Sequence, residues 1–370
     1  MTPPLLVGRD DVLTEFDESV LDGPGAPGRL SILTGARGVG KTVMLLELAD
    51  HVLREGWVTI SETATPGLVE RLMHTVTRTL YELDGSSKPG RQITGFSLPG
   101  GGGLTFSERP AMVVQWREQM GRLLDVLERN GTGLLITVDE VHSAGREELR
   151  DLATTYQHLA GEDRDIALVM AGLPSAVSDL LNDDVLTFLR RANRVELHDV
   201  DLGDVSEALR TTIESEGRHI TDSALVEATQ ATGGYPFMIQ LVGYHVWRKA
   251  DGDVIDDAAV AAGVPVARRR LGSLVHATAL ADLSDVDRTY LVAMAQDDGE
   301  SSTSTVAQRL RSTPAYAGTY RLRLIDAGMI EPTRRGYVDF ALPFLREYLR
   351  EHAARYEMSS RVSDPGPTAN

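Results

Sequence analysis

Short apolar runs alternate with amphipathic stretches through residues 1–200 of the chain. The runs have the length and the nearly continuous apolar character of strands buried in a parallel sheet, and the stretches between them repeat apolar residues at helical spacing. The expected strands are residues 29–34, 57–61, 133–138, 166–170 and 194–197, and the expected helices are residues 41–55, 68–83, 110–129 and 174–181. Alternating strands and helices predict a doubly wound α/β domain over residues 1–200.

The strand pattern stops after residue 200, and two further domains are predicted beyond it. Helical periodicity at residues 205–216, 223–232 and 235–249 predicts a small helical lid over residues 201–275. Three short helical patterns and one alternating segment follow, at residues 284–296, 304–311, 315–327 and 329–340. Three helices and a hairpin predict a winged helix-turn-helix domain over residues 276–358.

Two segments lie outside these patterns. Residues 84–106 are rich in glycine, serine and proline and interrupt the first domain. They are either a surface insertion or a moving functional element, and the sequence leaves both open. Residues 359–370 are expected to form a flexible tail.

The composition is that of a globular protein and narrows the chemistry. The chain has 370 residues, 42% of them hydrophobic and 25% charged, and it contains no cysteine. Disulfides, thiolate metal sites and cysteine nucleophiles are therefore excluded, and a reducing compartment fits. The N-terminus lacks the pattern of an export signal and no apolar run reaches membrane-spanning length, so we expect a cytoplasmic protein with no membrane partner. A net charge of -17 argues against non-specific coating of nucleic acid.

The most informative motif follows the first predicted strand and opens the first predicted helix. Residues 35–42, Gly-Ala-Arg-Gly-Val-Gly-Lys-Thr, match the Walker A pattern G-x-x-x-x-G-K-[ST]. Glycines let consecutive N–H groups turn toward phosphate oxygens, Lys41 bridges the β- and γ-phosphates, and the Thr42 hydroxyl ligates Mg²⁺. The residues expected to bind ATP here are Gly35, Gly38, Val39, Gly40, Lys41 and Thr42.

A second half of this site is expected at the end of the strand predicted over residues 133–138. Asp139 and Glu140 follow that strand in the Walker B arrangement. The Asp139 carboxylate would join the Mg²⁺ shell, and Glu140 would orient and deprotonate the attacking water. His142 either couples the nucleotide state to a partner or is a solvated loop histidine.

Five motifs in a fixed order carry a resemblance to a known family. They are Leu6-Val7-Gly8-Arg9-Asp10, the Walker A loop, Asp139-Glu140, Ala171-Gly172-Leu173-Pro174 and Gly233-Gly234-Tyr235-Pro236-Phe237. Together they resemble the AAA+/STAND-type P-loop ATPases related to the origin-recognition ATPases, which carry a C-terminal winged helix. The resemblance covers roughly residues 5–355. It implies that Val7, Gly8 and Arg9 lie against the adenine. It also implies that the Gly-Gly-Tyr-Pro segment, from which Pro236 is the expected contact, lies near the phosphates.

Two departures from the family pattern bear on activity. Related ATPases often carry a γ-phosphate-sensing arginine where this chain has Phe237, and residues 170–172 offer no polar side chain as a first sensor, leaving Ser175 nearby. The resemblance therefore implies an ATPase of low turnover. It also implies an arginine finger from a neighbouring subunit in the ATP state, for which Arg190, Arg191 and Arg194 are the candidates. The alternative is that these arginines are surface charge.

The predicted winged helix is locally basic. Residues 301–340 hold six arginines against three acidic residues, a local charge of +3. Arg321 and Arg323 lie on the expected recognition helix, and Arg334 and Arg335 lie on the expected wing. Such groups suit contacts to the phosphates of double-stranded DNA. Winged helices also serve as protein-interaction or autoinhibitory modules.

Two functions follow from these observations. The first is an ATP-dependent switch that couples its nucleotide state to DNA binding through the winged helix. The alternative is a STAND-like signalling or defence ATPase whose winged helix contacts protein. A metabolic kinase is disfavoured because no small-substrate pocket is recognisable.

Overall fold

The computed structural model describes residues 7–83, 109–143, 145–182 and 186–357. The chain divides into two compact units. Residues 10–34 and 41–196 form the first, which we call the sheet unit, and residues 1–9, 35–40 and 197–370 belong to the second, which we call the helical unit. The predicted insertion, residues 84–106, and the predicted tail, residues 359–370, lie outside the described residues.

The sheet unit contains a five-stranded parallel sheet with the strand order β2-β3-β4-β1-β5. Its strands are β1 (Leu30–Thr34), β2 (Val58–Thr63), β3 (Leu134–Asp139), β4 (Ile166–Gly172) and β5 (Asn193–Glu196). Every residue of β4 is buried, as expected for a central strand covered on both faces. The predicted parallel α/β fold is confirmed, with each of the five strands placed within three residues of its predicted bounds.

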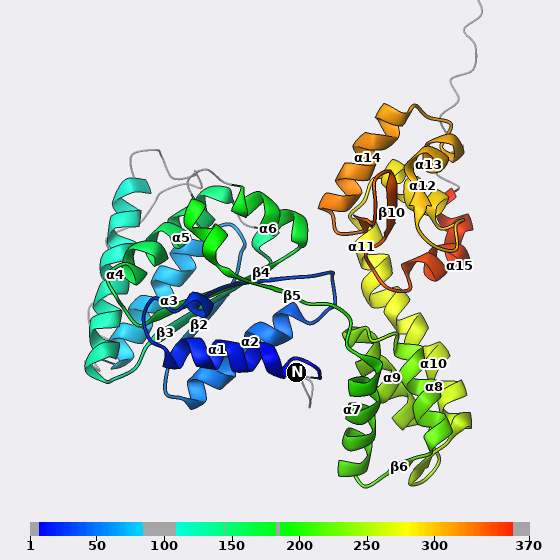
Figure 1. Ribbon diagram of the computed structural model, residues 1–370, viewed down its shortest axis with the longest axis horizontal. Coiled ribbons are helices and arrows are strands. Elements are labelled where there is room, and N and C mark those ends of the chain that lie inside the picture. Colours follow the sequence, from blue (N-terminus) through cyan, green and yellow to red (C-terminus); the bar gives the residue numbers. More distant parts are fainter. Residues whose placement is uncertain (1–6, 84–108, 144, 183–185, 358–370) are drawn as a thin grey trace, which may run out of the picture. The chain divides into compact units, whose positions relative to one another are not determined.

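Helices cover both faces of this sheet, with α1 and α2 drawn on one side and α5 and α6 on the other (Figure 1). The helices are α1 (Asp10–Leu21), α2 (Lys41–Arg54), α3 (Leu68–Leu83), α4 (Arg109–Arg129), α5 (Arg146–Ala160) and α6 (Pro174–Leu181). Helices α1 and α5 were not predicted from the sequence. In α5 the signal was present, since Leu149, Leu152, Tyr156 and Leu159 recur at helical spacing and are buried.

The first part of the helical unit is a group of four helices, which we call the α7–α10 bundle. Its elements are α7 (Leu202–Ser215), β6 (His219–Ile220), α8 (Asp222–Thr232), α9 (Pro236–Lys249), β7 (Val254–Ile255) and α10 (Asp257–Leu271). Helix α10 was not predicted, because Gly263 and Pro265 interrupt its pattern. Gly263 permits close packing on α9, since an added Cβ would lie 2.9 Å from the Cα of Val246.

A π-helix, Gly272–His276, and α11 (Ala277–Ala281) lead into the last part of the helical unit, which we call the C-terminal module. It contains α12 (Asp285–Met294), β8 (Ser301–Ser302), α13 (Thr303–Arg309), α14 (Pro314–Asp326), β9 (Ile330–Pro332), β10 (Tyr337–Phe340) and α15 (Leu345–Glu357). The three strands pair antiparallel in the order β8-β10-β9. The predicted helices and hairpin are present, and β8 and α15 are additions.

Separate hydrophobic cores lie in the α7–α10 bundle and in the C-terminal module. The core of the module includes the fully buried Tyr290, Val306 and Leu324. Burying an aliphatic side chain such as Val306 or Leu324 contributes about 1.5–3 kcal/mol. Over the part of the chain that the structure describes, none of the helices combines the length and the apolar character needed to cross a membrane.

Candidate nucleotide-binding site

The Walker A loop joins the end of β1 to the start of α2, as predicted. Gly35, Gly38 and Gly40 have φ angles of 150°, 76° and 101°, which side-chain-bearing residues rarely adopt. Lys41 begins α2 and is buried, with 7% of its surface exposed. The glycine spacing of the motif is therefore required by the backbone path of the loop.

Thr42 and Asp139 meet at the carboxyl end of β3. The Thr42 hydroxyl donates a hydrogen bond of 2.5 Å to a carboxylate oxygen of Asp139. Within the described ranges, no group of three or more metal-ligating side chains occurs. A hydroxyl beside one carboxylate nevertheless fits Mg²⁺, which usually takes one or two protein oxygens and completes its shell with water and phosphate. The pairing of the two predicted metal ligands thus suits a Mg²⁺–nucleotide complex.

Glu140 adopts a left-handed backbone conformation directly after β3, with φ at 57°. Its backbone N–H donates to Asp139 Oδ1 at 2.8 Å, and its carboxylate lies 2.9 Å from His142 Nε2. A non-glycine residue in this region costs about 1 kcal/mol and tends to occur at functional sites. The structure therefore brings His142 to the predicted catalytic carboxylate, a pairing that the sequence analysis did not foresee.

Tyr235 links the α7–α10 bundle to the Walker A loop. Its hydroxyl donates a 2.8 Å hydrogen bond to the carbonyl oxygen of Arg37, and a Cβ added to Gly38 would lie 1.9 Å from that hydroxyl. Burial, together with the nearby Asp199 carboxylate, raises the pKa of Tyr235, so the hydroxyl stays a donor at neutral pH. Pro236 follows and begins α9. The nearness of Pro236 to the phosphates stays a prediction, and Tyr235 of the same segment is the residue that contacts the loop.

The two glycines before Tyr235 pack against further parts of the helical unit. Gly234 approaches Val200 so closely that an added Cβ would lie 2.3 Å from its carbonyl oxygen. A Cβ on Gly233 would lie 3.2 Å from the ring of Phe344, which precedes α15 and has a φ of 62°. Residues 233–235 therefore contact the Walker A loop through Tyr235 and the C-terminal module through Phe344.

The predicted adenine-contacting residues lie against the start of the α7–α10 bundle. An added Cβ on Gly8 would lie 3.0 Å from the Asp204 carboxylate, and the Arg9 guanidinium donates to the carbonyl oxygen of His198. Burial lowers the pKa of Arg9, and Asp199 opposes that shift. The adenine contact itself stays a prediction.

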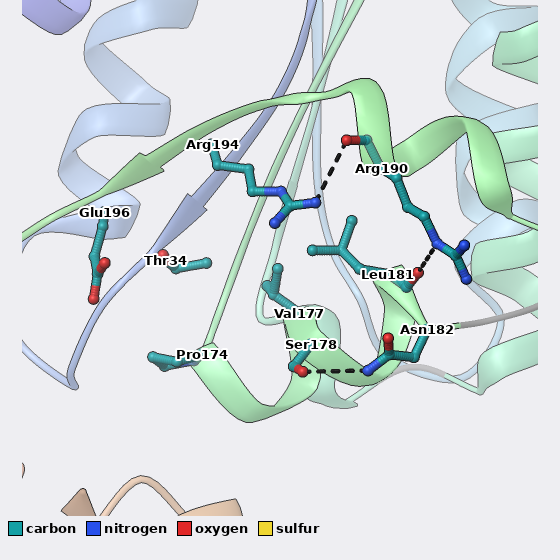
Figure 2. Close-up of a pocket in the computed structure, with 9 residues that line it drawn as sticks. All are labelled: Thr34, Pro174, Val177, Ser178, Leu181, Asn182, Arg190, Arg194 and Glu196. Atoms are coloured by element: carbon teal, nitrogen blue, oxygen red, sulfur yellow. Dashed lines mark hydrogen bonds between the residues drawn. The ribbon is translucent and has the colours of Figure 1, made fainter. Parts of the chain in front are cut away.

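Two of the three candidate finger arginines line a pocket of about 330 Å³ in the sheet unit. Figure 2 shows Arg194 extending toward Arg190 and Leu181. Arg190 Nε donates to the carbonyl oxygen of Leu181 at 2.9 Å, and an Arg194 Nη donates to that of Arg190 at 3.4 Å. Across the described residues, neither guanidinium forms an ion pair with a carboxylate, and Arg191 does not line the pocket.

The residues at the two sensor positions are apolar. Met170 and Ala171 are buried at the end of β4, and Phe237 packs against the core of the α7–α10 bundle. Ser175 lies in the first turn of α6. A sensing role for Ser175 stays a prediction.

The four candidate DNA-binding arginines differ in their surroundings. Arg323 pairs with the buried Asp287 at 2.9 Å, and Arg334 pairs with Glu300 at 2.6 Å and lies over the ring of Tyr337. Arg321 is partly buried, and within the described structure its buried Nε has no hydrogen-bond partner. Arg335 is exposed. Two of the four guanidiniums therefore already have carboxylate partners. The sequence did not reveal these two ion pairs.

The parallel sheet, the glycine loop and the Thr42–Asp139 pair are the features expected of a P-loop nucleotide site. Residues 5–169 match the family model described as an AAA ATPase domain, and residues 273–349 match a domain of unknown function. No curated protein sequence matches this chain.

Solved structures share the fold along nearly the whole chain. A Walker-type ATPase of Pyrococcus abyssi matches with a TM-score of 0.66 and 18% identity, over 93% of this chain and 96% of its own. The ORC2 protein of Aeropyrum pernix matches with a TM-score of 0.65 and 14% identity, over 98% and 97%. Residues 5–169 thus match an AAA ATPase domain, and the chain shares the fold of these two proteins. The resemblance seen in its motifs is confirmed at the level of the fold.

Proposed function

We propose that the protein is an ATP-binding molecular switch that hydrolyses ATP slowly and couples its nucleotide state to binding of double-stranded DNA by the C-terminal module. The observation that carries the proposal is the pair of contacts made by residues 233–235. Tyr235 holds the Walker A loop, and Gly233 packs on Phe344 of the C-terminal module. A change at the phosphate-binding loop has a short physical route to that module.

Nucleotide binding would use the loop and the residues that flank it. The inward-turned N–H groups of residues 35–42 and the Lys41 ammonium would hold the phosphates. Thr42 and Asp139 would hold Mg²⁺, which would neutralise charge on the β- and γ-phosphates. The A. pernix structure of similar fold was determined in ADPNP and ADP complexes, which supports this assignment.

Hydrolysis would be limited by what surrounds Glu140. Its carboxylate is 44% exposed and would take a proton from the attacking water, but its contact with His142 competes for the same oxygen atoms. The sensor positions hold Phe237 and the apolar end of β4, so little in this chain aligns the γ-phosphate. Slow turnover suits a switch, because a long-lived ATP state gives a partner time to respond.

Arg190 and Arg194 support self-association in the ATP state. Each has a guanidinium at a pocket of the sheet unit, and each is held by a backbone carbonyl rather than by a carboxylate in the described chain. An arginine in this state keeps N–H groups available for a phosphate of a second copy. We propose that one of them completes the active site of a neighbouring subunit.

The C-terminal module would be a winged helix. Its order of elements, from α12 through β8, α13 and α14 to β9 and β10, is that of such a domain, with α14 as the recognition helix. Arg321 and Arg323 on α14 and Arg334 and Arg335 between the last two strands would contact phosphates. Arg323 and Arg334 would have to leave their partners Asp287 and Glu300 in order to contact DNA. The affinity of the module for DNA would therefore be moderate.

These same ion pairs favour one alternative. If Arg323 and Arg334 stay with Asp287 and Glu300, the module serves as a protein-interaction or autoinhibitory domain of a STAND-like signalling ATPase. Fluorescence anisotropy with a mixed-sequence duplex distinguishes the two functions. The DNA function predicts that binding depends on ATP and loses that dependence in Lys41→Ala. Absence of duplex binding with ATP, ADP or no nucleotide would leave the signalling function.

A further inference from the structure

A hollow of about 470 Å³ lies on the α7–α10 bundle, and none of the residues assigned so far lines it. Leu241, Tyr244, His245 and Arg248 line it from one face of α9, at positions i, i+3, i+4 and i+7. Arg270 at the end of α10 and Leu274 in the π-helix complete the lining. Two of the apolar side chains are open to solvent, since Tyr244 is 55% exposed and Leu274 is 52% exposed.

Cations line this hollow and occupy the ends of the two helices that form it. Arg248 and Lys249 occupy the last turn of α9, and Arg268, Arg269 and Arg270 occupy the last turn of α10. All five are exposed, and none forms an ion pair within the part of the chain that the structure describes. The arginines of the C-terminal module differ, because Arg323 and Arg334 are paired.

The charged side chains that line the hollow, Arg248 and Arg270, are both cations, although the whole chain carries a charge of -17. The pKa of His245 is lowered by burial and then by Arg270, Arg248 and Lys249. Helix dipoles favour cations at C-terminal turns, but they explain neither the exposed Tyr244 nor the exposed Leu274 beside them.

The geometry of Tyr244 suits stacking. Arg248 donates a 2.9 Å hydrogen bond to the Tyr244 hydroxyl, and the His245 ring packs edge-on against the tyrosine ring at 5.1 Å. These contacts limit the motion of an aromatic ring that remains half open. The Arg248 guanidinium also lies over this ring, 5.6 Å from its centre. An aromatic ring bordered by guanidiniums that form no ion pair within the described residues combines the two features by which proteins hold unpaired bases.

We propose that this hollow binds single-stranded nucleic acid, with a base stacked on Tyr244 and adjacent phosphates held by Arg248 and Arg270. Lys249, whose charge also acts on His245, extends the basic surface beside Arg248. A duplex hides its base faces and so cannot use Tyr244. The site goes beyond the proposed function, since it requires neither ATP nor the C-terminal module.

Anisotropy of a fluorescein-labelled oligothymidylate of about 20 nucleotides tests this site, because such a strand exceeds the usual footprint of ~4–16 nucleotides. The full chain, without nucleotide, should bind it at about 50 mM salt. Removing both Arg248 and Arg270 by alanine should lower the magnitude of the salt slope by about 1.4, at ~0.7 for each phosphate contact. The control Arg54→Ala removes an exposed cation of the sheet unit and should leave binding unchanged.

Stacking is tested separately. Tyr244→Ala should weaken binding by about fivefold or more, whereas Tyr244→Phe keeps the ring and should stay within about twofold. Thermal melts establish that these variants are folded. Absence of oligothymidylate binding, or binding indifferent to Tyr244→Ala, would overturn the proposal, as would equal competition by polyglutamate.

The test is independent of the duplex experiment. Arg335→Ala in the C-terminal module should leave oligothymidylate binding intact while weakening duplex binding. Loss of ATP-dependent duplex binding alone would contradict the proposed function and leave this site standing. Absence of oligothymidylate binding alone would overturn this site and leave the proposed function standing.

Discussion

The hydroxyl of Tyr235 donates a 2.8 Å hydrogen bond to the carbonyl oxygen of Arg37, joining the α7–α10 bundle to the Walker A loop across 198 residues of sequence. Gly38 makes room for this contact, since any Cβ there would clash with the tyrosine hydroxyl. The loop and the residue that precedes α9 are therefore held together by this bond. Phosphate entering the loop would act on the bundle through this bond.

Tyr235→Phe should separate nucleotide binding from its consequences. The variant keeps the buried ring and loses one hydrogen bond, which contributes about 0.5–1.5 kcal/mol. The affinity for ATP, measured by titration with labelled ATP, should change by less than about tenfold. The difference in duplex affinity between the ATP and ADP states should largely disappear. Tyr244→Phe, on the exposed side of α9, is the matched control. A full ATP/ADP difference in Tyr235→Phe would contradict the coupling.

Glu140→Gln should bind ATP normally and hydrolyse it at least about tenfold more slowly, because an amide cannot accept the proton of water. Single-turnover assays measure the chemistry, and equilibrium titration measures the binding. His142→Ala provides the comparison, since it frees the Glu140 carboxylate and should not reduce turnover. Unchanged turnover in Glu140→Gln would remove this residue from the catalytic role.

An intersubunit arginine predicts specific activity that rises with protein concentration, since each active site is then completed by a second copy. Alanine at Arg190 or Arg194 should lower turnover and leave ATP affinity intact. Arg146→Ala, which removes an exposed arginine of the same unit, is the control. Constant specific activity over a wide dilution series, with a monomer in ATP, would exclude the intersubunit arrangement.

His276 gives a pH-dependent prediction. Burial lowers its pKa to about 4, while a hydrogen bond to the carbonyl oxygen of Pro343 opposes the shift. The unfolded chain takes up this proton near pH 6.5 and the folded chain does not, so His276 lowers stability as the pH falls from about 6.5 toward about 4. The melting temperature of His276→Gln minus that of the parent protein should therefore increase as the pH falls from about 6.5 toward about 4. A constant difference between His276→Gln and the parent protein across the window would contradict a depressed pKa at His276.

The sequence predicted the parts of this molecule whose causes are local. The Walker A loop was recognisable because its glycines and Lys41 act within eight residues of each other, between a strand and a helix. Apolar periodicity placed most strands and helices to within a few residues. Helix α10 was missed for an equally local reason, since Gly263 and Pro265 weaken its pattern while close packing on α9 stabilises it.

Contacts between distant residues were beyond the sequence. The Tyr235–Arg37 bond depends on how the turn before α9 meets the loop, and nothing in either segment specifies the other. Likewise, Arg323 looked like a phosphate ligand until the structure placed it beside the buried Asp287. Residue type gives the chemistry of a side chain, while tertiary packing decides which partner it has.

The central claim is that the nucleotide state controls DNA binding by the C-terminal module. Anisotropy of a mixed-sequence duplex, with the full chain in ATP and in ADP over a range of salt, tests it most directly. The account predicts affinities that differ by at least about fivefold between the two states, and a salt slope near -3 to -4 for about four phosphate contacts. Equal affinity in ATP and ADP, or a slope unaffected by alanine at Arg321, Arg323, Arg334 and Arg335, would contradict it.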